Sequence, residues 1–389
     1  MMIDNKLIDC FLKLLKYGIT GINPPKIPQG VTAEKLYALA KDHGLCSITA
    51  ITLNNLNIEL NELRPKIIND YKSETLADAM QHKAFDNIME KCCERKVVMV
   101  PLKGTIIKKL YPSVAMRRMC DVDILIHAED REKMKQIMLD SGFECTLYNN
   151  SSHDVYSLDK YVTFEVHTTF IPSRFRKQCE VNEMVWERAK QRETYPYVYD
   201  MCIEDVYAFH IAHSYKHYLY GGFGIKTLLD TYVILQKHPE LLENKEIEKR
   251  LISLKLKDFK LVLEKLTNIW FVNQNPNLTR YSDMTKYILL SGEYGNSKNK
   301  TVNSFVASEN ETINKLHLIR GLVFPPCELM KANYKYVKKN IVLLPVAYVH
   351  RIFTRCLMDK EKRRVYFDYT HSPYAHLRDE KKLLEEIQI

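Results

Sequence analysis

The chain contains 389 residues, which is long enough for two or three domains and too long for a small disulfide-stabilised module. Hydrophobic residues make up 46% and charged residues 27%, a balance that excludes a disordered protein and indicates a substantial core. The 57 Lys and Arg residues exceed the 48 Asp and Glu residues, giving a formal net charge of +9. This modest basic excess fits an anionic ligand such as phosphate and is weak evidence for nucleic acid.

The first 95 residues predict a helical N-terminal region. Apolar residues recur at helical spacing near the start and again from Ala33, and prolines and Gly30 separate these two segments. A further helix is expected over roughly Ser73 to Arg95. These segments would form a packed helical cap.

From Lys96 the pattern changes to short strands that alternate with helices. Strands are predicted over residues 96–102, 121–127, 143–148, 153–158 and 161–167, and helices over residues 105–111 and 128–141. Residues 96–190 therefore predict a small α/β or α+β sheet domain. Two helices are expected between Glu204 and Lys237, broken at Gly221-Gly222, and residues 191–389 read as a helical C-terminal region.

The cysteines and the apolar runs bear on where the protein resides. The ten cysteines lie between Cys10 and Cys356 without a CxxC pair, which is typical of reduced thiols. The N-terminal segment lacks the long apolar stretch of a signal peptide. The run from Ile341 to Val349 is much shorter than the ~20 residues of a membrane-spanning helix. We therefore expect a cytoplasmic protein with no membrane partner.

Two acids share one face of a predicted strand. Side chains alternate along a strand, so Asp121 and Asp123 point to the same side while Val122 and Ile124 point to the other. Like charges this close repel each other, and a divalent cation such as Mg²⁺ is the natural partner. Neutralising Asp123 should therefore relieve repulsion, leave the fold intact or slightly stabilised, and remove a metal ligand. The alternative is a strand edge that simply faces water.

The strand predicted over residues 161–167 places Glu165 and His167 together on one face. If this strand lies beside the Asp121–Asp123 strand, Glu165 completes a site of three carboxylates. Such a site can hold two metal ions about 3.5–4 Å apart, which stabilise the attacking and leaving oxygens in phosphoryl transfer.

A strand-to-helix turn lies upstream, at Lys103-Gly104-Thr105. A glycine in such a turn lets phosphate approach the backbone, and the N–H groups at the start of a helix attract the anion. Lys103 would add a positive charge and Thr105 a hydroxyl. The spacing does not match a Walker loop, so an ordinary tight turn remains the alternative.

The stretch PLKGTIIKKLYPSVAMRRMCDVDILI, followed by YVTFEVHTTF, resembles the uncharacterised bacterial nucleotidyltransferases with a Leu-Lys-Gly turn, within the polymerase β-like superfamily. The resemblance implies an α+β fold, with a small mixed-sheet core between helical N-terminal and C-terminal regions. It matches Gly104 to the turn glycine, Asp121 and Asp123 to the metal-binding pair, Glu165 to the third acid, and Arg117 to a basic residue before the pair. We expect Lys103 and Arg117 to face the triphosphate and to stabilise the departing pyrophosphate. Many superfamily members have Gly-Ser at the turn, where this chain has Gly-Thr.

The activity that the resemblance implies is transfer of a nucleoside monophosphate from an NTP, ATP among them, to an acceptor, with release of pyrophosphate. The cofactor would be Mg²⁺, with Mn²⁺ as an alternative. The acceptor could be a small molecule, a protein or RNA. The rival hypothesis is a catalytically inactive nucleotide-binding or regulatory protein of the same fold.

Other residues could line the acceptor side. His210, His213 and His217 share one helical face, with His167 as a possible companion. This face could contact substrate, serve the fold, or bind zinc, although no HExxH pattern accompanies it. Lys226 and Asp230 could reach the nucleotide or pair with each other across one helical turn.

The region from Lys331 to Arg355 is basic and interleaved with tyrosines. It could contact RNA or phosphate, whereas a solvated helix surface is the more common outcome. Nucleic acid is therefore a possible partner that the sequence does not favour.

Overall fold

The computed structural model describes residues 4–149, 153–169, 185–219, 221–254, 256–273, 282–293 and 340–356, with isolated positions between residues 295 and 337. The chain divides into two compact units, residues 1–296 and residues 297–389. The sheet and the predicted site residues belong to the first unit. Cys10, Cys46, Cys92 and Cys145 are among the free cysteines of the described chain.

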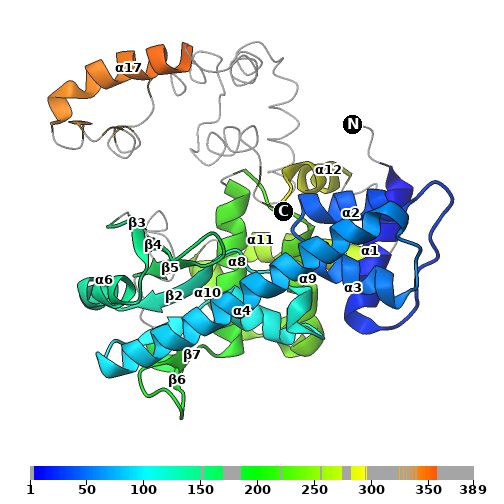
Figure 1. The fold of residues 1–389 in the computed structure, drawn as a ribbon, viewed down its shortest axis with the longest axis horizontal. Helices are drawn as coiled ribbons and strands as arrows, with labels where there is room; N and C mark the ends of the chain where they lie inside the picture. The colour runs from blue at the N-terminus through cyan, green and yellow to red at the C-terminus, as the bar shows by residue number, and fades with distance from the viewer. Residues whose placement is uncertain are drawn as a thin grey trace. The chain divides into compact units, whose positions relative to one another are not determined.

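The N-terminal region is helical, as expected (Figure 1). Its helices are α1 (Asn5–Thr20), α2 (Ala33–Asp42), α3 (Cys46–Asn55) and α4 (Arg64–Glu94). Thr32 caps α2 by accepting a hydrogen bond from the backbone N–H of Lys35. Helix α4 begins at Arg64, earlier than the predicted start near Ser73. A proline lies in its first turn, where the backbone N–H that proline lacks would have no partner within the helix.

A five-stranded mixed sheet follows α4, in the spatial order β1-β2-β5-β4-β3. Figure 1 labels four of these strands, β2, β5, β4 and β3. Its strands are β1 (Met99–Pro101), β2 (Val122–Ile126), β3 (Glu144–Leu147), β4 (His153–Ser157) and β5 (Thr163–His167). Strands β2 and β5 are parallel, whereas the β1-β2, β5-β4 and β4-β3 pairs are antiparallel. This confirms the mixed sheet and places the two acid-bearing strands side by side.

Short helices connect these strands. They are α5 (Gly104–Ile107), continued by a 3₁₀ turn over Lys108–Leu110, and α6 (Arg131–Asp140), preceded by a 3₁₀ turn over Ala128–Asp130. Both segments match the helices predicted between the strands.

One face of the sheet is apolar. Val122, Ile124, Phe164 and Val166 are buried there against α4 and α6. Strand alternation leaves the intervening residues of β2 and β5 on the opposite face. The core therefore fixes the register of the strands and directs the acids away from it.

The remaining described part of the first unit is mostly helical. Two short strands, β6 (Lys190–Gln191) and β7 (Tyr199–Asp200), precede α8 (Ile203–Leu219), α9 (Ile225–Lys237), α10 (Lys245–Ser253), α11 (Lys257–Thr267) and α12 (Ser282–Ser291). Helices α8 and α9 are the predicted pair, and Gly221 and Gly222 between them have φ of 132° and 108°, values that glycine tolerates best.

In the second unit the structure describes α17 (Leu344–Cys356). Ala347 packs there with Met330 and Val337. The basic residues Lys331, Lys335, Lys338 and Lys339 of the predicted nucleic-acid region lie outside the described residues. Among the described helices of either unit, none has the length and apolar character needed to cross a membrane.

Candidate functional site

Two carboxylates meet where β2 and β5 run in parallel. Asp123 of β2 and Glu165 of β5 are direct partners in the strand register. Their neighbours Val122, Ile124, Phe164 and Val166 face the apolar core, so both acids point to the other side of the sheet. Asp123 is only 2% exposed, whereas Glu165 is partly accessible. Chain segments that are about 40 residues apart in sequence thus build one acidic patch.

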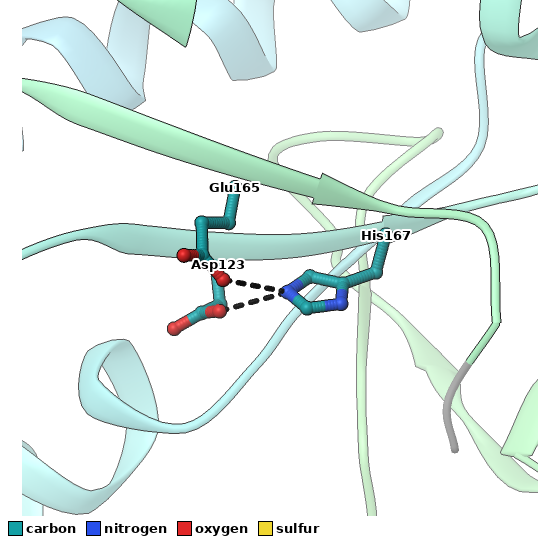
Figure 2. Close-up of side chains that lie close together, drawn as sticks. All are labelled: Asp123, Glu165 and His167. Atoms are coloured by element: carbon teal, nitrogen blue, oxygen red, sulfur yellow. Dashed lines mark hydrogen bonds and ion pairs between the residues drawn. The ribbon is translucent and has the colours of Figure 1, made fainter. Parts of the chain in front are cut away.

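His167 lies beside both acids (Figure 2). Its Nε2 atom is 2.8 Å from Asp123 Oδ1 and 3.5 Å from Glu165 Oε2. Burial alone would lower the pKa of His167, but the two carboxylates outweigh it and raise that pKa. On the outer side of Glu165, His153 Nε2 lies 3.8 Å from Glu165 Oε1. Glu165 is therefore flanked by two imidazoles.

Asp121 immediately precedes β2 and completes the acidic cluster. Burial, and next the charge of Asp123, raise the pKa of Asp121 to about 6. Burial also disfavours the charge on Asp123, but Lys103 and His167 offset this and hold the pKa of Asp123 below its usual range. The two acids of the DxD motif thus differ. Cationic neighbours balance the charge of Asp123, whereas the burial of Asp121 and its repulsion by Asp123 are mostly uncompensated.

Lys103 lies at the end of β1, where the predicted turn begins. Its Nζ atom is 2.7 Å from Asp123 Oδ1, and its side chain is 15% exposed. Burial would lower the pKa of Lys103, but Asp123, Asp121 and Glu165 together raise it. The backbone at Lys103 has φ of 40° and ψ of −110°, a conformation that a non-glycine residue rarely adopts and that often marks a functional site.

The turn therefore differs in detail from the expectation. The unusual backbone belongs to Lys103, whereas a Cβ at Gly104 would lie 2.9 Å from Met119 Sδ and 3.1 Å from Arg117 Nη1, so a side chain there would displace these atoms. The hydroxyl of Thr105 donates a hydrogen bond to the Leu102 carbonyl at 2.7 Å. In this structure the Thr105 hydroxyl holds the turn together and is not offered to a phosphate.

Arg117 was expected at the phosphates, but it forms a buried ion pair with Asp230 of α9. Its Nε and Nη2 atoms lie 2.7 and 2.8 Å from the two carboxylate oxygens, and Tyr111 also donates a hydrogen bond to Asp230 at 2.7 Å. Burial opposes the charge on Asp230, and Arg117 more than compensates, lowering the pKa of Asp230. This bidentate contact ties the loop before Asp121 to α9.

Of the two alternatives for Lys226 and Asp230, the pairing with each other is wrong. Lys226 Nζ contacts Glu293 Oε1 at 2.7 Å, while Asp230 is held by Arg117. The two residues are one helical turn apart, but a longer-range partner of opposite charge is available to each. Lys226 is still close enough to Asp121 to lower the pKa of that acid.

The predicted histidine face separates into two parts. His210 Nε2 lies 2.8 Å from the Thr231 hydroxyl of α9 and serves the packing of the two helices. His213 and His217 contact each other, with 3.2 Å between their Nε2 atoms. Burial, reinforced by the positive charge of Lys103, holds the pKa of His213 well below its usual range and that of His217 at about 4. Both rings are therefore uncharged at neutral pH.

Sequence reasoning missed Lys216. It is partly buried on α8, and burial together with the charge of Lys103 lowers its pKa, while Glu165 and Asp123 act in the opposite direction. These mutual influences place Lys216 near the acidic cluster. The sequence did contain a signal for this residue, because Lys216 lies three residues after His213 and is therefore its neighbour on the helix surface.

The site can hold a cation. Within the described ranges, Asp123, Glu165 and His167 form the one group of three potential metal ligands whose donor atoms all lie within 4.8 Å of one another. The histidine face of α8 forms no such group among these residues, so the zinc alternative finds no support there. Asp121 and Lys103 lie beside this group, linked to it by charge.

Known proteins similar to this chain include one solved structure and the members of one sequence family. The antibiotic-resistance factor ANT(2″)-Ia, whose structure was determined in solution, aligns with 12% identity and a TM-score of 0.27, covering 54% of this chain and 97% of that one. No curated protein sequence matches the chain. The family model described as "Uncharacterised nucleotidyltransferase" matches residues 29–272, more than half of the chain. The chain therefore belongs to this uncharacterised nucleotidyltransferase family, as the resemblance at the Leu-Lys-Gly turn predicted.

Proposed function

We propose that the protein transfers a nucleoside monophosphate from an NTP to a hydroxyl-bearing acceptor, with release of pyrophosphate. The observation that carries the proposal is the pairing of Asp123 and Glu165 in register on adjacent parallel strands, with Asp121 beside them. Family membership supports nucleotide transfer as the general chemistry.

The proposed reaction is metal-dependent. Asp121, Asp123 and Glu165 would hold the cation, and Mg²⁺ suits such carboxylates when substrate phosphates supply further oxygens. When bound, divalent cations stabilise the negative charge on the transferred phosphoryl group and on the leaving oxygen. The crowding of Asp121 against Asp123 supports this assignment, because a cation would remove the repulsion that raises the pKa of Asp121.

Two lysines are proposed to bind the triphosphate. Lys103 now neutralises Asp123, and a cation bound there would free its Nζ for phosphate oxygens. Lys216 approaches the same acids from α8. A positive charge near the departing pyrophosphate stabilises charge that grows as the bond to the α-phosphate breaks.

The acceptor is proposed to lie against α8. The uncharged rings of His213 and His217 can both donate and accept hydrogen bonds, which suits a hydroxyl group. His210, Asp230 and Lys226 support the surrounding fold through Thr231, Arg117 and Glu293, respectively.

The rival function, an inactive nucleotide-binding protein, has one observation in its favour. Lys103 already neutralises Asp123, as it could in a protein that has no need of metal. Against the rival, all three acids remain clustered although Lys103 compensates mainly Asp123, and burial together with the charge of Asp123 raises the pKa of Asp121, a cost that a bound cation would offset.

The test is a transfer screen. The protein is incubated with Mg²⁺, cell extract and each α-³²P-labelled NTP in turn, beside the Glu165→Gln variant. We expect one labelled product that depends on the wild-type protein, on Mg²⁺ and on Glu165. Nucleotide binding without labelled product in any extract would favour the rival function.

A further inference from the structure

An imidazole nitrogen lies between the carboxylates of the proposed metal site. His167 Nε2 faces Asp123 Oδ1 at 2.8 Å and Glu165 Oε2 at 3.5 Å, and the same nitrogen makes both contacts (Figure 2). His167 is only 6% exposed, so its ring is held in the protein interior beside the two acids. Its place on β5, two residues after Glu165, fixes it on the same face of the sheet.

The spacing of the three donor atoms suits one metal ion. Two ligands at about 2.1 Å from an octahedral ion, at right angles to each other, lie about 3 Å apart. The two nitrogen-to-oxygen distances of 2.8 and 3.5 Å bracket that value. A cation could therefore enter between these residues with little movement of their side chains.

From this geometry we infer that His167 is itself a metal ligand, so that the site is a mixed nitrogen and oxygen site that binds a first-row transition ion in preference to Mg²⁺. The inference rests on the proposed function for the presence of a metal, and it concerns the identity of one ligand and of the ion. A site built from carboxylates alone would show a weaker preference for transition ions over Mg²⁺.

The chemical reason is ligand softness. Mg²⁺ takes oxygen ligands almost exclusively, whereas imidazole is a common ligand of first-row transition ions, whose affinities rise from Mn²⁺ towards Cu²⁺. Mn²⁺ occupies similar sites to Mg²⁺ and accepts an imidazole nitrogen more readily. Exchanging an oxygen for a nitrogen ligand therefore raises the affinity for Mn²⁺ relative to Mg²⁺.

The chain offers a matched control in His153. This residue lies on the neighbouring strand β4, and its Nε2 atom is 3.8 Å from the other oxygen of Glu165. Its ring centroid is 5.2 Å from that of His167. His153 is thus a second imidazole at the same acid, and it lies outside the three-residue group of potential ligands formed by Asp123, Glu165 and His167.

The test uses electron spin echo spectroscopy of Mn²⁺ bound to the full-length protein, which detects a coordinated ¹⁴N nucleus. We expect nitrogen coupling in the wild type, its loss in His167→Ala and its retention in His153→Ala. Competition between Mn²⁺ and Mg²⁺ should show that His167→Ala lowers the ratio of their affinities about tenfold or more.

Two results would overturn the inference. One is bound Mn²⁺ without nitrogen coupling in the wild type, a measurement that needs no variant to fold. The other is coupling that survives in His167→Ala. Nucleotide transfer with either result would leave the proposed function standing with oxygen ligands only, whereas absence of any divalent-ion binding would defeat both proposals.

Discussion

The two aspartates of the DxD motif should respond oppositely to the same isosteric change. Asp121→Asn removes a buried charge that Asp123 repels. Asp123→Asn removes the charge that pairs with Lys103 and His167. We therefore expect Asp121→Asn to stabilise the metal-free protein and Asp123→Asn to destabilise it. This revises the expectation from sequence, in which neutralising Asp123 relieves repulsion.

The magnitude for Asp121 follows from its pKa. Burial and the charge of Asp123 raise that pKa from 3.8 to about 6, which corresponds to about 3 kcal/mol at most. Because the folded-state pKa lies above the unfolded one, the penalty is absent below about pH 4, grows as the pH rises towards 6, and is complete above it. The gain from Asp121→Asn should therefore appear across this window and stay constant at higher pH.

The magnitude for Asp123 has the opposite sign. Removing one partner of a buried ion pair typically costs about 3–5 kcal/mol, because the other charge is left without compensation. The pKa of Asp123 is lowered in the fold, so its contribution is present above the unfolded pKa and is lost only as the pH falls below it. The loss in Asp123→Asn should be larger at pH 5 than at pH 8, because Asp123 favours protonated His167 and disfavours ionised Asp121.

The assay is thermal unfolding of the full chain in EDTA, from pH 4.5 to pH 8, for the wild type and both variants. At pH 7.5 we expect Asp121→Asn to melt above the wild type and Asp123→Asn below it. The difference for Asp121→Asn should shrink towards zero as the pH approaches 4. Equal shifts of the same sign in the two variants would refute the claim that Lys103 and His167 compensate Asp123 selectively.

Further predictions concern residues around the acids. Arg117→Ala should lower the free energy of unfolding by about 3–5 kcal/mol, because Asp230 is left buried without its partner. The double variant Arg117→Ala/Asp230→Ala should recover part of this loss in thermal melts. Unchanged melting with lost turnover would instead indicate that Arg117 binds the phosphates. Lys216→Gln should weaken NTP binding several-fold in titrations, while the control Lys237→Gln, at the exposed end of α9, should leave it unchanged. Equal effects of the two variants would show that Lys216 does not contact the NTP. Gly104→Ala should lower the free energy of unfolding by about 1–3 kcal/mol, since its Cβ would lie 2.9 Å from the nearest side-chain atom. A variant as stable as the wild type would contradict the close packing of the turn.

Strand alternation predicted the essential part of the site. It placed Val122 and Phe164 in the core and Asp123, Glu165 and His167 on the opposite face, and the structure has this arrangement. That Glu165 lies beside Asp123 depended on the two strands being neighbours. The resemblance to a family supplied this, because periodicity alone does not pair strands.

Partners distant in sequence could not be predicted. Arg117 precedes the acids as a phosphate-binding residue would, but its partner Asp230 lies on a helix more than a hundred residues later. Likewise Lys226 has an acid one turn away and still pairs with Glu293. Such choices depend on how α9 packs against the sheet domain, which local spacing does not encode.

The fate of the individual phosphates distinguishes nucleotidyl transfer from other reactions of an NTP. One NTP is supplied with the label on either the α- or the γ-phosphate, together with the purified protein, a divalent cation and the extract that supports turnover. We predict that the α-label enters the product, that the γ-label leaves as pyrophosphate, and that Glu165→Gln does neither. Transfer of the γ-label to the product, or unchanged transfer by Glu165→Gln, would contradict nucleotidyl transfer at the site of Asp123 and Glu165.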